Sequence, residues 1–164
     1  MNCQKCKAID KLPSGCSPTP GSGPKNTKLM FINDRSDLIS CSLAEPFSTN
    51  DGDFLFKILK DLSIDKKTCY FTSLVKCTEY SIGNARTCFN WLLEEISEIK
   101  PEYIISLGER TAMFLLPKNL EYKNCLFQTY NNILVAPSLH KLLNGPSADV
   151  RLFKRKLKEF YGIS

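Results

Sequence analysis

Cysteines are the residues of this sequence whose type and spacing most directly suggest chemistry. The chain holds eight of them, and Cys3 and Cys6 form a Cys-x-x-Cys pair. Cys77 and Cys88 complete a plausible set of four thiolates, which suits either an iron–sulfur cluster or a tetrahedral zinc ion. Alternatively, Cys77 and Cys88 are ordinary buried cysteines. The spacing alone leaves both interpretations open.

The other four cysteines have no spacing that suggests a shared ligand. Cys69 falls inside a predicted strand, which favours a place in the core. We expect this second set to be incidental to any metal site: Cys16, Cys41, Cys69 and Cys125.

Two further residues are candidates for work at a ligand crevice. His140 is the only histidine and follows a predicted strand, where it would either face a crevice or serve a structural role. Phe47, in the polar loop that begins Glu45-Pro46, could stack on a base or plug the edge of a core.

Positive charge is densest near the end of the chain, in a predicted helix. The net charge of +5 and the isoelectric point of about 8.7 are compatible with a polyanion, but fall short of the isoelectric point above ~9 of strongly basic nucleic-acid domains. The helix could bind phosphates or an acidic partner, or could present an ordinary solvated face. Its basic residues are Arg151, Lys154, Arg155, Lys156 and Lys158.

Length and composition restrict the classes of protein. The 164 residues suit one domain, and a hydrophobic share of 43% argues against a disordered chain. No apolar run approaches the ~20 residues that span a bilayer, and the first residues lack the apolar stretch of a signal peptide. We therefore expect a cytoplasmic protein without membrane contact, in which cysteines bind metal more often than they form disulfides.

The candidate residues must be positioned by the elements around them. Residues 1–27 are rich in Lys, Gly, Ser and Pro and are expected to form an extension, with 28–164 as the folded domain. Apolar and β-branched runs predict four strands, at 28–32, 68–75, 102–107 and 133–136. Helical spacing predicts helices at 53–62, 85–99, 108–116 and 147–161.

This alternation predicts an α/β fold, a three-layer sandwich with a central four-stranded parallel sheet. Ligands bind such sheets at the carboxyl ends of the strands. Those ends fall at 33–36, 73–77, 108–110 and 137–140.

Taken in order, these pieces resemble the iron–sulfur (family 4) uracil-DNA glycosylases over nearly the whole chain. The strand at 29–32 is similar to the one before that family's first motif, and 104–108 to a later strand and turn. The remaining matching motifs are Cys3-x-x-Cys6, Glu45-Pro46-Phe47 with Gly52-Asp53-Phe54-Leu55, Thr72-Ser73-Leu74-Val75-Lys76-Cys77, Cys88, and Pro137-Ser138-Leu139-His140.

The resemblance implies a uracil-DNA glycosylase-like fold and a resident cofactor. It implies that Cys3, Cys6, Cys77 and Cys88 hold a 4Fe-4S cluster, with zinc as the alternative. Such a cluster would be structural and would tie residues 1–27 to the domain.

The sequence also departs from the family's motifs. Where the family has Gly-Glu-x-Pro-Gly, this chain has 33–37 with Asp34 in the acidic place. The asparagine that reads the uracil edge is Ser73 here, which is too short for the paired hydrogen bonds of an amide. His140 is followed by Lys141 in place of proline.

A glycosylase must flip a base, read its edge and stabilise the departing anion. Because the stacking ring survives and the base-reading residues do not, the resemblance implies a non-catalytic subunit that binds single-stranded DNA in a replication or repair complex. Similar glycosylase-like proteins accompany A-family DNA polymerases in phages and mobile elements, so a polymerase is the expected partner. The residues expected to contact DNA are Phe47, Ser73, Lys76, Arg151, Lys154, Arg155 and Lys158.

Two alternatives remain at this point. The chain could be an active glycosylase for uracil or another deaminated base, with Asp34 orienting water and His140 stabilising the leaving base. It could instead be a protein-binding module whose basic helix meets an acidic partner.

Overall fold

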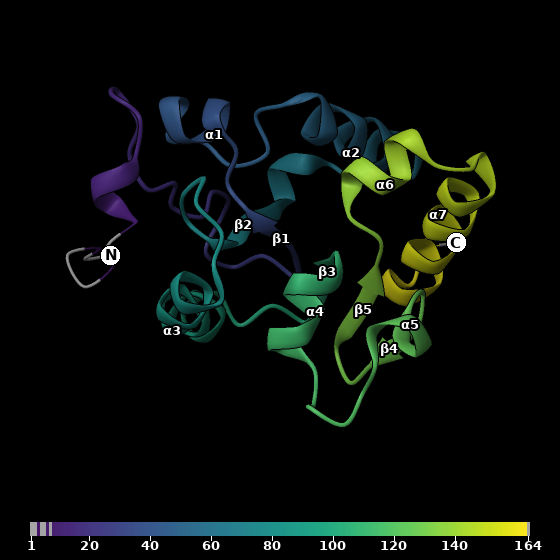
Figure 1. Ribbon diagram of the computed structural model, residues 1–164. Coiled ribbons are helices and arrows are strands. Elements are labelled where there is room, and N and C mark those ends of the chain that lie inside the picture. Colours follow the sequence, from purple (N-terminus) through teal and green to yellow (C-terminus); the bar gives the residue numbers. More distant parts are fainter. Residues whose placement is uncertain (1–2, 4–5, 7, 164) are drawn as a thin grey trace.

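A five-stranded sheet forms the centre of the molecule in the computed structural model, which describes residues 3, 6 and 8–163 (Figure 1). The strand order is β2-β1-β3-β5-β4, and all neighbours are parallel except the last pair. The strands are β1 (Leu29–Arg35), β2 (Cys69–Val75), β3 (Tyr103–Leu107), β4 (Thr129–Tyr130) and β5 (Ile133–Ala136).

Helices connect these strands and cover both faces of the sheet (Figure 1). In the described residues they are α1 (Leu38–Leu43), α2 (Asn50–Asp61), α3 (Ile82–Ile99), α4 (Glu109–Leu115), α5 (Tyr122–Cys125), α6 (Leu139–Asn144) and α7 (Ser147–Tyr161), with the 3-10 turns η2 (Ile9–Lys11) and η3 (Lys66–Thr68). The helix α3 begins earlier than predicted because Ser81 Oγ accepts the Asn84 N–H and caps it.

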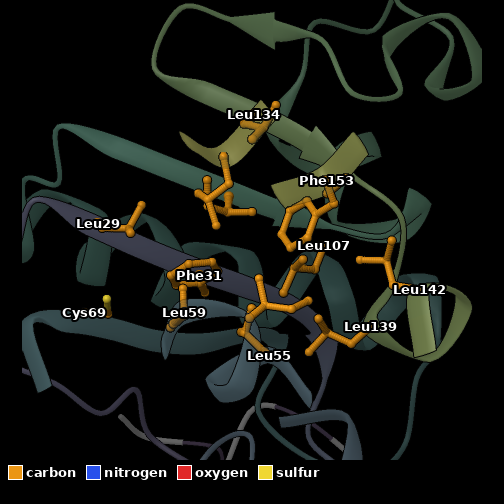
Figure 2. Packing of buried hydrophobic residues seen from close by; sticks show 14 of the residues in the cluster. Leu29, Phe31, Leu55, Leu59, Cys69, Leu107, Leu134, Leu139, Leu142 and Phe153 are labelled. Atoms are coloured by element: carbon orange, nitrogen blue, oxygen red, sulfur yellow. The ribbon is translucent and has the colours of Figure 1, made fainter. Parts of the chain in front are cut away.

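The larger core lies between one face of the sheet and the helices α2, α6 and α7. Every second residue of β1, such as Leu29 and Phe31, points into it, since side chains alternate along a strand. Figure 2 shows these residues facing Leu55 and Leu59 of α2 and Phe153 of α7. Alternate side chains of the strands therefore pack against the apolar faces of the helices in one layer.

The opposite face of the sheet is covered by α3 and by the start of the chain. Met30 and Ile32 of β1 pack there with Leu92 of α3. Cys6 and Ala8 belong to the same cluster, which brings the N-terminal segment against the sheet. Buried side chains on both faces are typical of parallel sheets covered by helices.

The predicted α/β class and the three-layer arrangement are confirmed, and the four predicted strands form the parallel part of the sheet. The fifth strand, β4, was not predicted because it has only two residues and one exposed side chain. It pairs antiparallel with β5 across a tight turn in which Asn131 adopts φ 52°.

Residues 17–22 run along the folded domain instead of standing away from it. The Thr19 N–H donates to the carbonyl of Lys76 at 2.7 Å, and Ser22 forms a β-bridge with Phe71. The proposed division at residue 27 stays a prediction. No helix in the described part of the chain is long and apolar enough to cross a bilayer.

Candidate functional site

The strand order creates a crevice at the carboxyl end of β1. From β1 the chain crosses to β2 on one side, and from β2 it returns to β3 on the other side of β1. Ligands of open α/β sheets bind at such a reversal of direction. A cleft of about 430 Å³ lies beside this point, between the end of β1, the start of α2 and the start of α6.

Asp34 lines the cleft and is held by an ion pair. Its Oδ2 lies 3.2 Å from Nη1 of Arg110, which comes from the first turn of α4. The guanidinium carbon of Arg110 also lies 4.3 Å from the ring centroid of Tyr80. The pair thus joins the carboxyl ends of β1 and β3 across the crevice.

His140 lies on the other wall, in the first turn of α6. Ser138 caps this helix, because its Oγ accepts the Lys141 N–H at 3.3 Å. The imidazole is 76% exposed, and its Nδ1 lies 4.0 Å from Oδ1 of Asp51 at the start of α2. His140 and Asp34 therefore line the same cleft, and their roles there stay predictions.

Phe47 forms part of the cleft wall and is also part of the core. Its ring centroid lies 5.4 Å from that of Phe71, and only 6% of the residue is exposed. Its backbone has φ 61°, and Gly52 of α2 packs directly against its carbonyl group. A ring fixed in this way has little freedom to turn, so any stacking must use the edge or face that already borders the cleft.

Ser73 and Lys76 lie away from the cleft. Ser73 is buried in β2, paired with Asn33, and does not line the cavity. The predicted DNA contact of Lys76 does not fit this structure, because its ammonium group is buried and bound to Glu95 at 2.6 Å. Sequence reasoning placed Lys76 at a strand end correctly but could not give the side of the sheet to which it turns.

The basic residues of α7 are partly neutralised. Lys154 Nζ lies 2.5 Å from Oδ2 of Asp61 on α2, and Arg155 pairs with Glu159 at 3.7 Å. Arg151 and Lys158 are exposed and have no carboxylate partner within the described part of the chain. The contact of these four residues with DNA stays a prediction.

The four cysteines singled out by spacing line one small cavity behind β2. Cys3 and Cys6 come from the N-terminal segment, Cys77 follows β2, and Cys88 lies in α3. Burial raises the pKa of Cys77 to about 11, with the neighbouring Cys88 and Cys6 adding to the shift. The pKa of Cys88 is also raised, chiefly by burial.

The chemistry of this donor set fits a thiolate-bound metal centre, and two of the thiols make hydrogen bonds in this conformation. Cys6 Sγ donates to Oδ1 of Asn84 at 3.6 Å, and Cys77 Sγ to the carbonyl of Glu79 at 3.9 Å. Among residues 3, 6 and 8–163, no group of three or more Cys, His, Asp or Glu residues is arranged to hold a metal ion. A bound metal centre would take the place of these two thiol hydrogen bonds.

A buried polar network borders the same cavity. Lys76 Nζ donates to Glu95 and to Thr72, and Thr72 Oγ1 donates to Glu95 Oε2 at 2.6 Å. The N–H of Gly21 donates to Glu95 Oε1 at 3.2 Å. The network therefore places one buried cation beside the cysteines and joins α3, β2 and the N-terminal segment.

Sequence reasoning assigned no role to several residues of the cleft and its surroundings. Asp51 and Arg110 line or border the cleft, yet neither belongs to a recognisable motif. Four exposed lysines between residues 57 and 67 were also missed, although their density in the sequence was a usable signal. They are Lys57, Lys60, Lys66 and Lys67.

Comparisons with known proteins agree with this architecture. The profile of the Uracil DNA glycosylase superfamily matches residues 20–161. The chain is 27% identical over 154 residues to the type-4 uracil-DNA glycosylase of Saccharolobus solfataricus, covering 84% of this chain and 70% of that protein. It is 23% identical over 120 residues to the type-4 uracil-DNA glycosylase of Archaeoglobus fulgidus, covering 70% of this chain and 59% of that protein.

A bacterial relative gives a similar result. The type-4 uracil-DNA glycosylase of Thermotoga maritima is 25% identical over 121 residues, covering 69% of this chain and 62% of that protein. The matched part thus spans between 59% and 70% of the length of these three relatives.

Proposed function

This chain belongs to the uracil DNA glycosylase superfamily, and we propose that it binds single-stranded DNA as a non-catalytic subunit of a replication or repair complex. The cleft at the end of β1 is the proposed contact with the DNA. Phe47 provides an apolar wall there, and His140 is exposed at its mouth. The relatives are named uracil-DNA glycosylases, which supports DNA as the ligand.

The observation that carries the non-catalytic part of the proposal is the state of the cleft's polar groups. Ser73 lies outside the cleft, so it does not offer a side chain for reading a base edge there. Asp34 already accepts a charged hydrogen bond from Arg110, which competes with the orientation of a water molecule. A cleft that has an apolar wall, but lacks residues to read the base edge and to orient water, can hold a base without cleaving its glycosidic bond.

The proposed cofactor is a 4Fe-4S cluster held by Cys3, Cys6, Cys77 and Cys88, with zinc as the alternative. Four thiols around one cavity support it. Anaerobically purified protein should contain roughly four iron and four sulfide per chain. Cys6→Ser should lose the iron, whereas Cys16→Ser, outside the cavity, should retain it; zinc or no metal in the purified protein would overturn the cluster.

A DNA polymerase is the proposed protein partner, on the family resemblance alone. Co-elution of the purified chain with a polymerase of the same organism on size-exclusion chromatography would support it. Separate elution at micromolar concentration, with and without DNA, would count against it.

An active glycosylase is the second candidate, because Asp34, Phe47 and His140 line one cleft. In this alternative Asp34 would orient the attacking water, and His140 would stabilise the departing base. His140 would have to turn from its exposed position toward the base.

Abasic-site formation separates the two candidates. The protein is incubated with uracil-, hypoxanthine- and xanthine-containing single strands, and abasic sites are revealed by alkaline cleavage. The proposed function predicts binding without abasic sites. Turnover that His140→Ala abolishes would overturn it in favour of the active enzyme.

A further inference from the structure

Four lysines form a positively charged surface at the end of α2 that lies away from the cleft. Lys57 and Lys60 lie on α2, and Lys66 and Lys67 lie in η3. All four are exposed, and none forms an ion pair within the part of the chain that the structure describes. Three of them, with Phe56, line a hollow of about 580 Å³, the lysine hollow.

This surface contrasts with α7, which carries more basic residues. On α7, Arg155 and Lys156 both pair with Glu159, and Lys154 pairs with Asp61. Around the lysine hollow the one lining carboxylate is Asp65, whose Oδ1 accepts the backbone N–H of Lys67. The cations of the lysine hollow are therefore available to an outside anion.

A second hollow connects this surface to the cleft. This middle hollow, of about 380 Å³, shares Phe47 with the cleft. It shares Phe56 and Lys66 with the lysine hollow. Each cavity thus shares lining side chains with the next, and the three together form a depression in three parts beside α2, whose 12 residues extend for about 18 Å.

The walls of this depression combine aromatic rings with cations. Phe56 packs edge-on against Phe71, with ring centroids 5.3 Å apart, and Lys66 Nζ lies 4.3 Å from the centroid of Phe56. Glu45 and Asp53 line the middle hollow, so the positive charge is concentrated at its far end. Cations that follow a groove with aromatic walls are typical of sites that hold a single nucleic-acid strand.

We propose that this depression is the track of the single strand whose base lies at the cleft, with Lys57, Lys60, Lys66 and Lys67 binding its phosphates. The inference rests on the proposed DNA binding and adds the direction in which the strand leaves the cleft. A strand that follows the track leaves along α2 toward η3, and does not depend on α7. The available lysines and the aromatic side chains between them and the cleft favour a nucleic-acid strand over an acidic protein segment.

Salt-dependent binding of a fluorescein-labelled oligothymidylate, followed by fluorescence anisotropy, tests the track. The track variant replaces all four lysines with glutamine. A matched control also replaces four exposed cations and so reaches the same net charge, but none of its residues lies on α7 or lines the three cavities. The control substitutions are Lys25→Gln, Lys28→Gln, Lys118→Gln and Lys123→Gln.

The track variant should bind at least about tenfold more weakly at about 50 mM salt, and its log–log salt slope should shrink by roughly 0.7 for each lysine lost. The control should stay within about threefold of the unmodified chain. Equal losses in both variants, or no loss in the track variant, would overturn the track while leaving DNA binding intact.

Two other outcomes would reject the nucleic acid as the ligand of these lysines. Absence of binding by the unmodified chain would overturn the proposed DNA binding together with the track. If polyglutamate displaces the oligonucleotide from the unmodified chain but not from the track variant, at concentrations matched in charge, the lysines select acidic protein and the track is wrong. Failure of polyglutamate to compete supports the nucleic-acid backbone.

Discussion

Lys76 is the residue whose environment is most unlike that expected for its type. Only 1% of its side chain is exposed, and burial lowers its pKa while the adjacent Glu95 opposes that shift. A charge buried without a partner is far more costly than a paired one. The Thr72–Lys76–Glu95 network is therefore needed to keep this lysine inside the fold.

A double-mutant cycle measures this dependence. Glu95→Gln should lower the free energy of unfolding by about 3 kcal/mol, because it leaves a buried ammonium group without its carboxylate. Lys76→Met should cost less, since Glu95 is 18% exposed and can be hydrated. Urea unfolding of both single variants and the double variant provides the test; strictly additive losses would show that the two side chains do not depend on each other.

Gly52 is required by a close backbone approach. A methyl group at this position would overlap the carbonyl oxygen of Phe47, which belongs to backbone and cannot turn aside. Gly52→Ala should therefore displace the Phe47 loop and weaken oligonucleotide binding at least about fivefold. Gly83→Ala, at a helical glycine with open surroundings, is the matched control and should leave binding unchanged; equal binding by both variants would argue against Phe47 as a cleft wall.

Cys69 should make stability depend on alkaline pH. Burial raises its pKa from 9.0 to about 11, so between these values the folded chain keeps a proton that the unfolded chain releases. The resulting stabilisation is complete below pH 9 and is lost as pH rises through 11. The full stabilisation is about 2 to 3 kcal/mol. When unfolding is measured at several pH values from 8 to 11, the free energy of unfolding should fall less steeply with pH for Cys69→Ala than for the unmodified chain. Equal slopes for the two proteins would contradict the raised pKa of Cys69.

At the scale of elements, α1 depends on one capping residue that also borders the cleft. Asp37 Oδ1 accepts a hydrogen bond from the Ser40 N–H at 2.8 Å, and Asp37 Oδ2 accepts one from the Ser40 hydroxyl at 3.0 Å. Asp37→Ala should cost about 1 kcal/mol of unfolding free energy, while Asp37→Asn, which can still cap, should cost less. Thermal unfolding with equal loss for both variants would show that the charge, and not the cap, matters.

The elements themselves were largely predictable, and the reason is visible in particular segments. β1 and β2 are apolar on both faces, which is what a covered parallel strand requires, so their composition alone identifies them. The helix α6 was missed because six residues after a strand provide too short a helical period to recognise. β4 was missed because its two residues are too few to show an alternating pattern.

At the scale of the whole molecule, the sequence predicted which strand ends lie together but not which way each side chain turns. Asp34 and His140 were placed at one crevice because carboxyl ends of parallel strands share an edge. The burial of Lys76 and the pairing of Lys154 with Asp61 depend on tertiary contacts that no local pattern encodes. The placement of the three neighbouring hollows beside α2 arises in the same way.

Photocross-linking tests the central claim, that a single strand binds the cleft and leaves it beside α2. An oligothymidylate carrying one 5-iodouracil is irradiated with the protein, and the linked peptides are identified by mass spectrometry. A strand bound in this way should cross-link to the segments that contain Phe47, Phe56 and His140. Cross-links confined to the exposed faces of α3 and α4, with none in these segments, would contradict it.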